Sequence, residues 1–138
     1  MEKNFTIWAF VEVSPAGAGP IDLHSCYVTH GIATDPAGET ATLTFRREHE
    51  WPGPANYPEE VTLTCSGNLR FAFNDLAATH EPLAGQSVTI GYYDAFCDWN
   101  DWLDEDQAAA QGYEGLQIGF SGGLVLRIRA DTAELRTA

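Results

Sequence analysis

The chain has 138 residues, of which 44% are hydrophobic and 12% aromatic, and its formal net charge is −13. This size and composition exclude a disordered chain and predict a single folded domain, residues 1–138, with a substantial core. The chain has no run of eighteen apolar residues, the length that a membrane-spanning helix needs, so no membrane partner is expected. The excess of acids repels phosphates, which argues against direct binding of nucleic acid.

The three cysteines bear on the cellular compartment. An odd number of cysteines does not fit a disulfide framework. Free thiols are usual where the environment is reducing. The sequence therefore predicts a cytoplasmic protein.

The first part of the chain alternates apolar segments with turn residues. Alternation of apolar and polar residues predicts strands at 5–13, 21–34 and 39–50. Trp8 and Phe10 lie on the face opposite the other apolar residues of the first strand, which predicts a central strand covered on both sides. Asp35-Pro36-Ala37-Gly38 is typical of a turn between the next two strands.

Possible zinc ligands occur in the second predicted strand. His24, Cys26 and His30 have even spacing and would share a face of a regular strand. At ~3.3 Å per residue, however, the two histidines would lie about 20 Å apart. We therefore predict no metal and no cofactor.

The segment from 51 to 73 combines a loop with a predicted hairpin. The loop 51–58 contains three prolines and presents Trp51 and Tyr57, which could form a contact surface. Alternation on either side of Ser66-Gly67-Asn68 predicts a hairpin over 59–73. Residues 74–85 are irregular, with at most one helical turn near 75–78, and a strand is expected at 87–96.

The most acidic stretch, 94–111, is predicted to contain the one substantial helix, over about 98–111. Asp98 is a suitable N-cap, Asp101 complements the helix dipole, and Gly112 can close the helix. Four acids would form an acidic face beside an apolar stripe that contains Trp99 and Trp102: Asp98, Asp101, Asp104 and Glu105. Asp98 to Ala109 also approaches the spacing of a calcium loop, but it lacks the central Gly and the final Glu.

The last part of the chain contains the clearest hairpin signal. Alternating apolar residues over 115–130 flank Gly122-Gly123, which can adopt the backbone angles of a tight turn. The tail begins with Asp131 and has Glu134 three residues later, which predicts a short capped helix or turn. The expected fold class is therefore α+β and mainly antiparallel β. We expect about six to eight strands in a sandwich or partly open barrel.

No catalytic or phosphate-binding motif is present, so we expect a binding protein and not an enzyme. The leading hypothesis is a small acidic inhibitor, comparable in class to immunity proteins or to nucleic-acid mimics such as anti-CRISPR proteins. Its basic protein partner, for example a nuclease or another nucleic-acid-binding protein, would contact aromatic residues and the charges around them: Trp51, Tyr57, Asp98, Asp101, Asp104 and Glu105. Two alternatives are a small-molecule-binding β-barrel and a hydrolase that uses Asp94 or His49. Asp94 is a candidate catalytic acid because nearby aromatic residues could raise its pKa.

Overall fold

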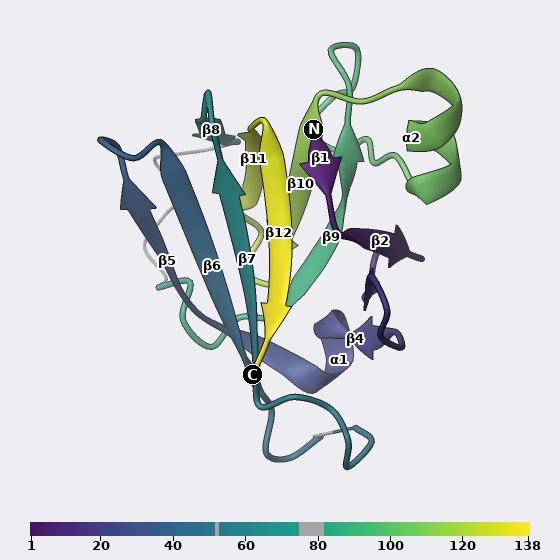
Figure 1. The fold of residues 1–138 in the computed structure, drawn as a ribbon, viewed down its shortest axis with the longest axis vertical. Coiled ribbons are helices and arrows are strands. Elements are labelled where there is room, and N and C mark those ends of the chain that lie inside the picture. The colour runs from purple at the N-terminus through teal and green to yellow at the C-terminus, as the bar shows by residue number, and fades with distance from the viewer. Residues whose placement is uncertain (52, 75–81) are drawn as a thin grey trace.

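The computed structural model describes residues 1–51, 53–74 and 82–138. Strands arranged mostly antiparallel dominate these residues, and two short helices accompany them (Figure 1). The fold class, mainly antiparallel β with few helices, is as predicted. The helical turn expected near residues 75–78 lies outside the described residues.

The largest sheet has five strands in the order β1-β12-β7-β6-β5. The pairs β5–β6, β6–β7 and β7–β12 are antiparallel, whereas β1 pairs parallel with β12. The alternation of apolar residues explains why β6 and β7 each bury one face. The bounds of the five strands are Glu2–Lys3 (β1), Thr132–Thr137 (β12), Glu60–Ser66 (β7), Thr40–Arg47 (β6) and Tyr27–Asp35 (β5).

A four-stranded antiparallel sheet has the order β8-β11-β10-β9. It contains the predicted C-terminal hairpin, which is confirmed as β10 paired with β11. Residues 121–124 connect the two strands, and Gly123 has a φ of 101°, which glycine adopts readily. The bounds of the strands are Arg70–Phe73 (β8), Val125–Arg129 (β11), Gly115–Phe120 (β10) and Val88–Tyr93 (β9).

Two predicted strands are wrong in the region of the third sheet, because each is interrupted. The segment 5–13 is not one central strand, because Ala9 and Phe10 have φ values of 52° and 62° and reverse the chain. The segment 21–34 is also interrupted, since the Asp22 carboxylate caps a short helix, α1. The resulting elements are β2 (Phe5–Trp8), β3 (Glu12–Pro15), β4 (Ile21–Asp22) and α1 (Leu23–Cys26).

The hairpin predicted over 59–73 is wrong, although both of its strands exist. Strand β7 belongs to the five-stranded sheet and β8 pairs with β11 in the other sheet. Between them Gly67 and Asn68 have positive φ values. Alternation identifies a strand, but it does not identify the partner of that strand.

The predicted C-terminal helix or turn is also wrong, because the tail forms β12. Ala133 and Leu135 are buried at a spacing of two residues, as a strand with one covered face requires. The Asn4 side chain fixes this strand by donating to the Leu135 carbonyl and accepting from the Leu135 amide.

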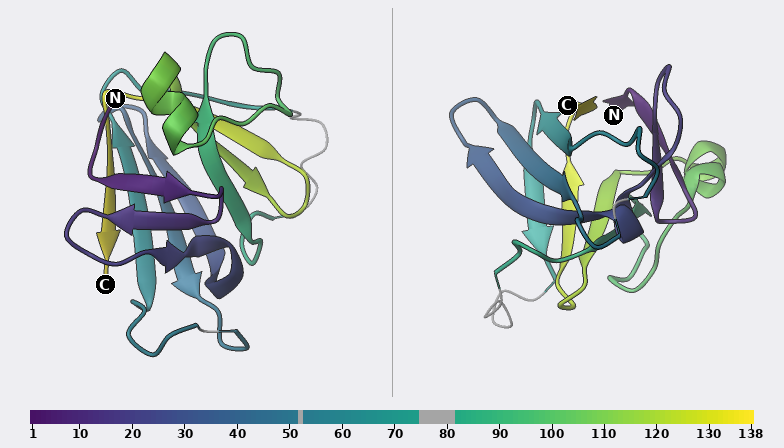
Figure 2. Two further views of the ribbon diagram at one scale, coloured as in Figure 1. Left: turned by 90° about the vertical axis from the view of Figure 1, so that its right-hand side faces the viewer. Right: turned by 90° about the horizontal axis from the view of Figure 1, so that it is seen from below.

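One hydrophobic cluster contains buried residues from all three sheets. The small sheet β2-β3-β4 covers one side of the space between the two larger sheets, and its strands run across theirs (Figure 2). The sheets do not close into a barrel. The described residues form twelve strands rather than six to eight, because two predicted strands are each divided in two and because β1 and β12 were not predicted as strands. Within those residues, no helix has the length and apolar character needed to cross a membrane.

Candidate functional site

The acidic stretch forms a loop followed by a short helix, which corrects the helix predicted over 98–111. Helix α2 is confined to Glu105–Gln111, and its N-cap is Asp104 instead of Asp98. Asp104 and Gln107 exchange hydrogen bonds in a capping box. The helix cannot begin earlier because Leu103 is extended and bonds to Tyr92 of β9 through both backbone groups. We call residues 94–103, which connect β9 to this cap, the acidic loop.

Trp102 holds the end of the acidic loop against the outer face of the four-stranded sheet. Two glycines, Gly91 on β9 and Gly119 on β10, leave room for its ring, because a Cβ atom at either would lie 3.1 Å from Trp102. The Phe10 ring packs edge-on against the same indole, with 6.2 Å between centroids. Phe10, predicted in a strand, and Trp102, predicted in a helix, therefore pack against each other on this face of the sheet.

Arg127 of β11 fixes the middle of the acidic loop. Its guanidinium donates to the carbonyls of Asp98 at 2.7 Å and Cys97 at 3.2 Å, while its Nε donates to Gln117 Oε1 at 2.6 Å. The same guanidinium lies 4.6 Å from the Tyr93 ring centroid and 4.4 Å from that of Trp99. Such charged hydrogen bonds and cation–π contacts give this part of the loop a defined conformation.

Gln117 provides a second connection beneath the loop. This fully buried side chain donates to the backbone carbonyls of Trp99 and Asp101, at 3.4 and 3.1 Å. Its oxygen accepts from Arg127, so both ends of the amide are used. The loop backbone is consequently attached to the sheet at several points along its length.

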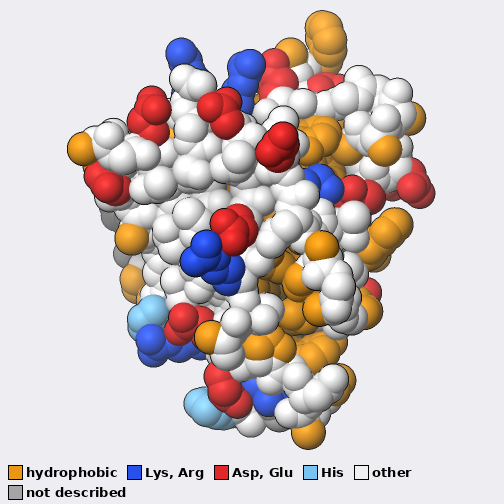
Figure 3. Space-filling model, viewed as in Figure 1, with side chains coloured by type: hydrophobic (Ala, Val, Ile, Leu, Met, Phe, Trp, Pro, Cys, Tyr) orange, Lys and Arg blue, Asp and Glu red, His pale blue; other side chains and the backbone are white. Residues whose placement is uncertain are grey.

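The outer end of the loop presents Phe96, whose surface is 95% exposed. The Phe96 amide donates to Asp94 Oδ1, and the other oxygen of Asp94 accepts from Gln111 of α2, each at 2.9 Å. Asp98 and Asp101 are exposed nearby on the same loop. In the space-filling view, hydrophobic and acidic side chains lie at the upper end of the molecule, over the loop that follows β9, and basic side chains lie beside them (Figure 3).

The predicted acidic residues differ in their surroundings. Glu105 lies mostly inside, where its carboxylate accepts from Tyr92, from Lys3 at 2.9 Å and from the Ile7 amide at 2.9 Å. Burial alone would raise the pKa of Glu105, but these hydrogen bonds lower it below its usual 4.5. Asp104 is engaged as the helix cap. Of the four acids predicted to form one face, Asp98 and Asp101 are therefore the exposed members.

The two predicted aromatic contacts lie at the other end of the molecule. The loop after β6, which carries Trp51 and Tyr57, is at the bottom of the view, whereas the acidic loop is at the top (Figure 1). Trp51 is 74% exposed. Tyr57 instead stacks on Tyr27, and its hydroxyl accepts from the Asp22 amide. The six predicted residues thus do not form one surface.

Phe96 is the residue that sequence reasoning missed. The pattern assigned it to the end of the strand 87–96, whereas β9 ends at Tyr93. The signal that could have placed it is Asp94, because aspartate readily accepts from an amide two residues later and starts a turn. An aromatic residue just after such a turn, among acids, indicates an exposed position.

The geometry does not favour the two alternative functions. Hydrogen bonds, chiefly from the Cys97 thiol, lower the pKa of Asp94, whereas the hydrolase hypothesis expected it to be raised. His49 is exposed just after β6, in the region remote from the acidic loop. For the ligand barrel, the open arrangement of the sheets provides no closed lumen.

The structure also bears on the weak zinc pattern. His24 and Cys26 are in α1 and His30 is in β5, so the regular strand that would align them does not exist. His24 Nδ1 lies 2.8 Å from the Val88 carbonyl. Residues 1–51, 53–74 and 82–138 contain no group of three or more ligands placed to hold a metal ion.

Comparisons with protein families, with curated proteins and with solved structures found no match.

Proposed function

We propose that this chain is a cytoplasmic binding protein of the inhibitor type, which engages a basic protein partner through its acidic loop. The observation that carries the proposal is Phe96, 95% exposed at the outer end of a loop that also exposes Asp98 and Asp101. Aromatic anchors surrounded by charge are typical of energetically important positions in protein interfaces. The proposed architecture for presenting this loop is a sandwich-like pair of sheets.

The attachment of the loop distinguishes Phe96 from an ordinary exposed apolar residue. Its turn is fixed by Asp94, and the following backbone is held by Arg127 and Gln117. A loop that already has a defined conformation loses less entropy on binding than a free one. This arrangement favours a rigid recognition element.

The charge of the protein favours the same kind of partner. A net charge of −13 steers a basic surface toward the molecule and repels acidic competitors. An interaction of this kind weakens as salt screens the charges. The class of inhibitor that binds nucleases or nucleic-acid-binding proteins, as immunity proteins and nucleic-acid mimics do, has such partners.

A pull-down with two matched variants tests the proposal. One bait carries Phe96→Ser and Asp98→Lys, and the control carries Trp51→Ser and Glu50→Lys, so each loses one exposed aromatic and reverses one exposed acid. We expect wild type and control to capture the same basic protein at low salt, and the loop variant to capture it at least about tenfold less. Equal capture by both variants, or loss only in the control, would exclude the acidic loop as the binding surface.

A further inference from the structure

Three arginines share the outer face of the four-stranded sheet, although the chain has only seven lysines and arginines in total. On β11, Arg127 and Arg129 alternate with buried Leu126 and Ile128. Arg70 of β8 is the direct cross-strand neighbour of Arg129. Arg127 donates hydrogen bonds to the acidic loop, whereas contacts with that loop do not explain the positions of Arg70 and Arg129.

The two arginines form a like-charge pair. Side chains directly opposite on antiparallel strands have Cβ atoms about 4.5–5.5 Å apart, and like charges there are destabilising. Among the described residues, Glu114 is the acid that pairs with Arg129, at 3.9 Å, and both of these side chains are partly exposed. The side chain of Arg70 makes no hydrogen bond or ion pair with any residue in the part of the chain that the structure describes.

Other basic residues of this protein are paired more closely. Lys3 and Arg136 lie 2.9 and 2.8 Å from carboxylates, and Arg46 lies 3.5 Å from one. With twenty acids in the chain, a shortage of acids does not explain why this arginine pair has only one long ion pair among the described residues. Binding of an external anion would explain it.

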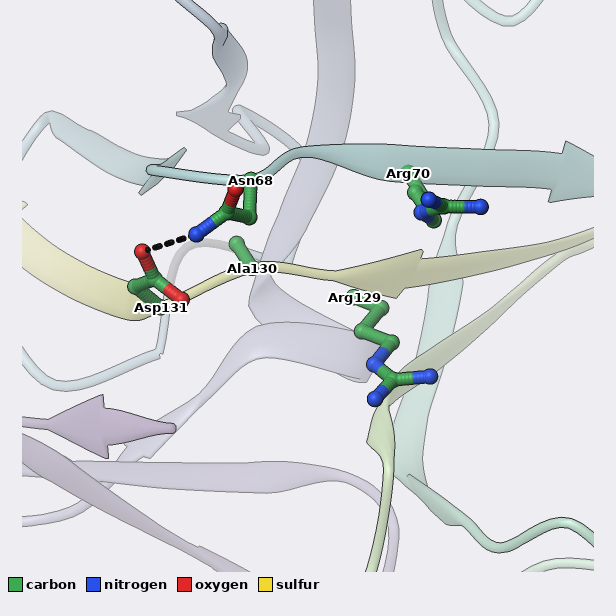
Figure 4. A pocket seen from close by; sticks show the side chains of 5 residues that line it. All are labelled: Asn68, Arg70, Arg129, Ala130 and Asp131. Atoms are coloured by element: carbon green, nitrogen blue, oxygen red, sulfur yellow. Dashed lines mark hydrogen bonds between the residues drawn. The ribbon is translucent and has the colours of Figure 1, made fainter.

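The pair stands between two neighbouring hollows of the surface. Both hollows are lined by Arg70 and Arg129; one, of about 510 Å³, continues to Asn68 and Asp131, and the other, of about 330 Å³, continues to Trp99. In the first hollow the two arginine side chains extend from neighbouring strands at one end, and Asn68 donates to Asp131 at the other end (Figure 4). The guanidinium groups therefore have open space in which to meet a small ligand.

We infer that Arg70 and Arg129 form an oxyanion-binding site for the phosphate or carboxylate group of a small ligand. Guanidinium groups present N–H donors in a geometry that matches both kinds of oxyanion. An anion placed between the two arginines interacts favourably with both and offsets their mutual repulsion. Glu114 and Asp131 restrict the position of the anion to the space nearest the arginines.

Calorimetric titration of the whole chain with inorganic phosphate, and separately with acetate, tests the inference at constant ionic strength. We expect saturable binding to wild type, and dissociation constants weakened at least about tenfold in Arg70→Gln and in Arg129→Gln. Arg46→Gln is the control, since it removes the same charge from another exposed strand position. Arg70→Lys should bind more weakly than wild type because it keeps the charge without the planar fork.

The two anions identify the source of the ligand group. Preference for phosphate assigns the site to phosphorylated ligands, and preference for acetate assigns it to carboxylates. Without an added anion, Arg70→Gln should be at least as stable as wild type, because the repulsion is removed. Absence of saturable binding with both anions, or equal weakening in Arg46→Gln, would overturn the inference.

Discussion

Replacement of Arg127 by leucine should loosen the acidic loop and lower the stability of the whole protein. The substitution keeps an apolar stem on β11 but removes donors to Gln117 and to the Asp98 and Cys97 carbonyls. Hydrogen bonds to charged groups contribute about 1.5–3 kcal/mol each, but the exposed carbonyls regain water. We therefore expect a net loss of about 2–4 kcal/mol, which corresponds to a fall in Tm of roughly 7–14 °C.

Chemical denaturation measures the free energy of unfolding, and native-state hydrogen exchange locates the change. Amides in the acidic loop, residues 94–103, should exchange faster in Arg127→Leu, whereas amides of β6 and β7 should respond only through global unfolding. Arg46→Leu is the matched control, because that arginine is exposed and makes one long ion pair at 3.5 Å. A change below about 0.5 kcal/mol in Arg127→Leu would refute the anchoring role assigned to this residue.

Three further predictions concern packing, pH and thiol reactivity. Gly119→Ala should lower the free energy of unfolding by about 1–3 kcal/mol, because the new Cβ would lie 2.8 Å from Thr89 Oγ1 and 3.1 Å from the Trp102 ring. Gly31→Ala, which has open space, should have a small effect, and equal denaturation midpoints for the two variants would contradict this. The pKa of Glu105 in the folded protein lies below its usual 4.5, so ionised Glu105 stabilises the fold fully above about pH 4.5, and this contribution is lost as the pH falls through the lowered pKa. Glu105→Gln should therefore make the free energy of unfolding depend less on pH in the acid range. Parallel stability curves for the variant and wild type would count against the prediction. Burial raises the pKa of the Cys65 thiol to about 12, so iodoacetamide should label the partly exposed Cys97 well before Cys65, as followed by mass spectrometry. Equal labelling rates would contradict the burial of Cys65.

The sequence predicted strands better than it predicted their arrangement. Alternation located β6, β7, β10 and β11, because each buries every second residue against the core. It did not reveal that β7 and β8 enter different sheets, since pairing depends on contacts distant in sequence. The tail was mistaken for a helix because a possible capping pattern was given more weight than the alternation of Ala133 and Leu135.

The candidate site was predicted in part. The composition identified the acidic stretch, but the predicted N-cap of its helix, Asp98, lies six residues before the observed one, Asp104. Both aspartates are suitable caps, and tertiary contacts decide between them. Leu103 pairs with β9 and Trp102 fits over two glycines, and neither contact has a local signature. Phe96, in contrast, is exposed just after the turn that Asp94 starts, and this local signal was hidden by the alternation that extended the predicted strand to residue 96.

Site-specific photocrosslinking tests the central claim most directly. A photoreactive benzoylphenylalanine replaces Phe96 in one protein and Trp51 in another; both positions are strongly exposed, at 95% and 74%. After irradiation in lysate of the native host at low salt, we expect position 96 to form one major crosslink to a basic protein, and high salt to reduce it. Crosslinking of that protein from position 51 but not from position 96, or the same yield at high salt, would contradict binding through the acidic loop.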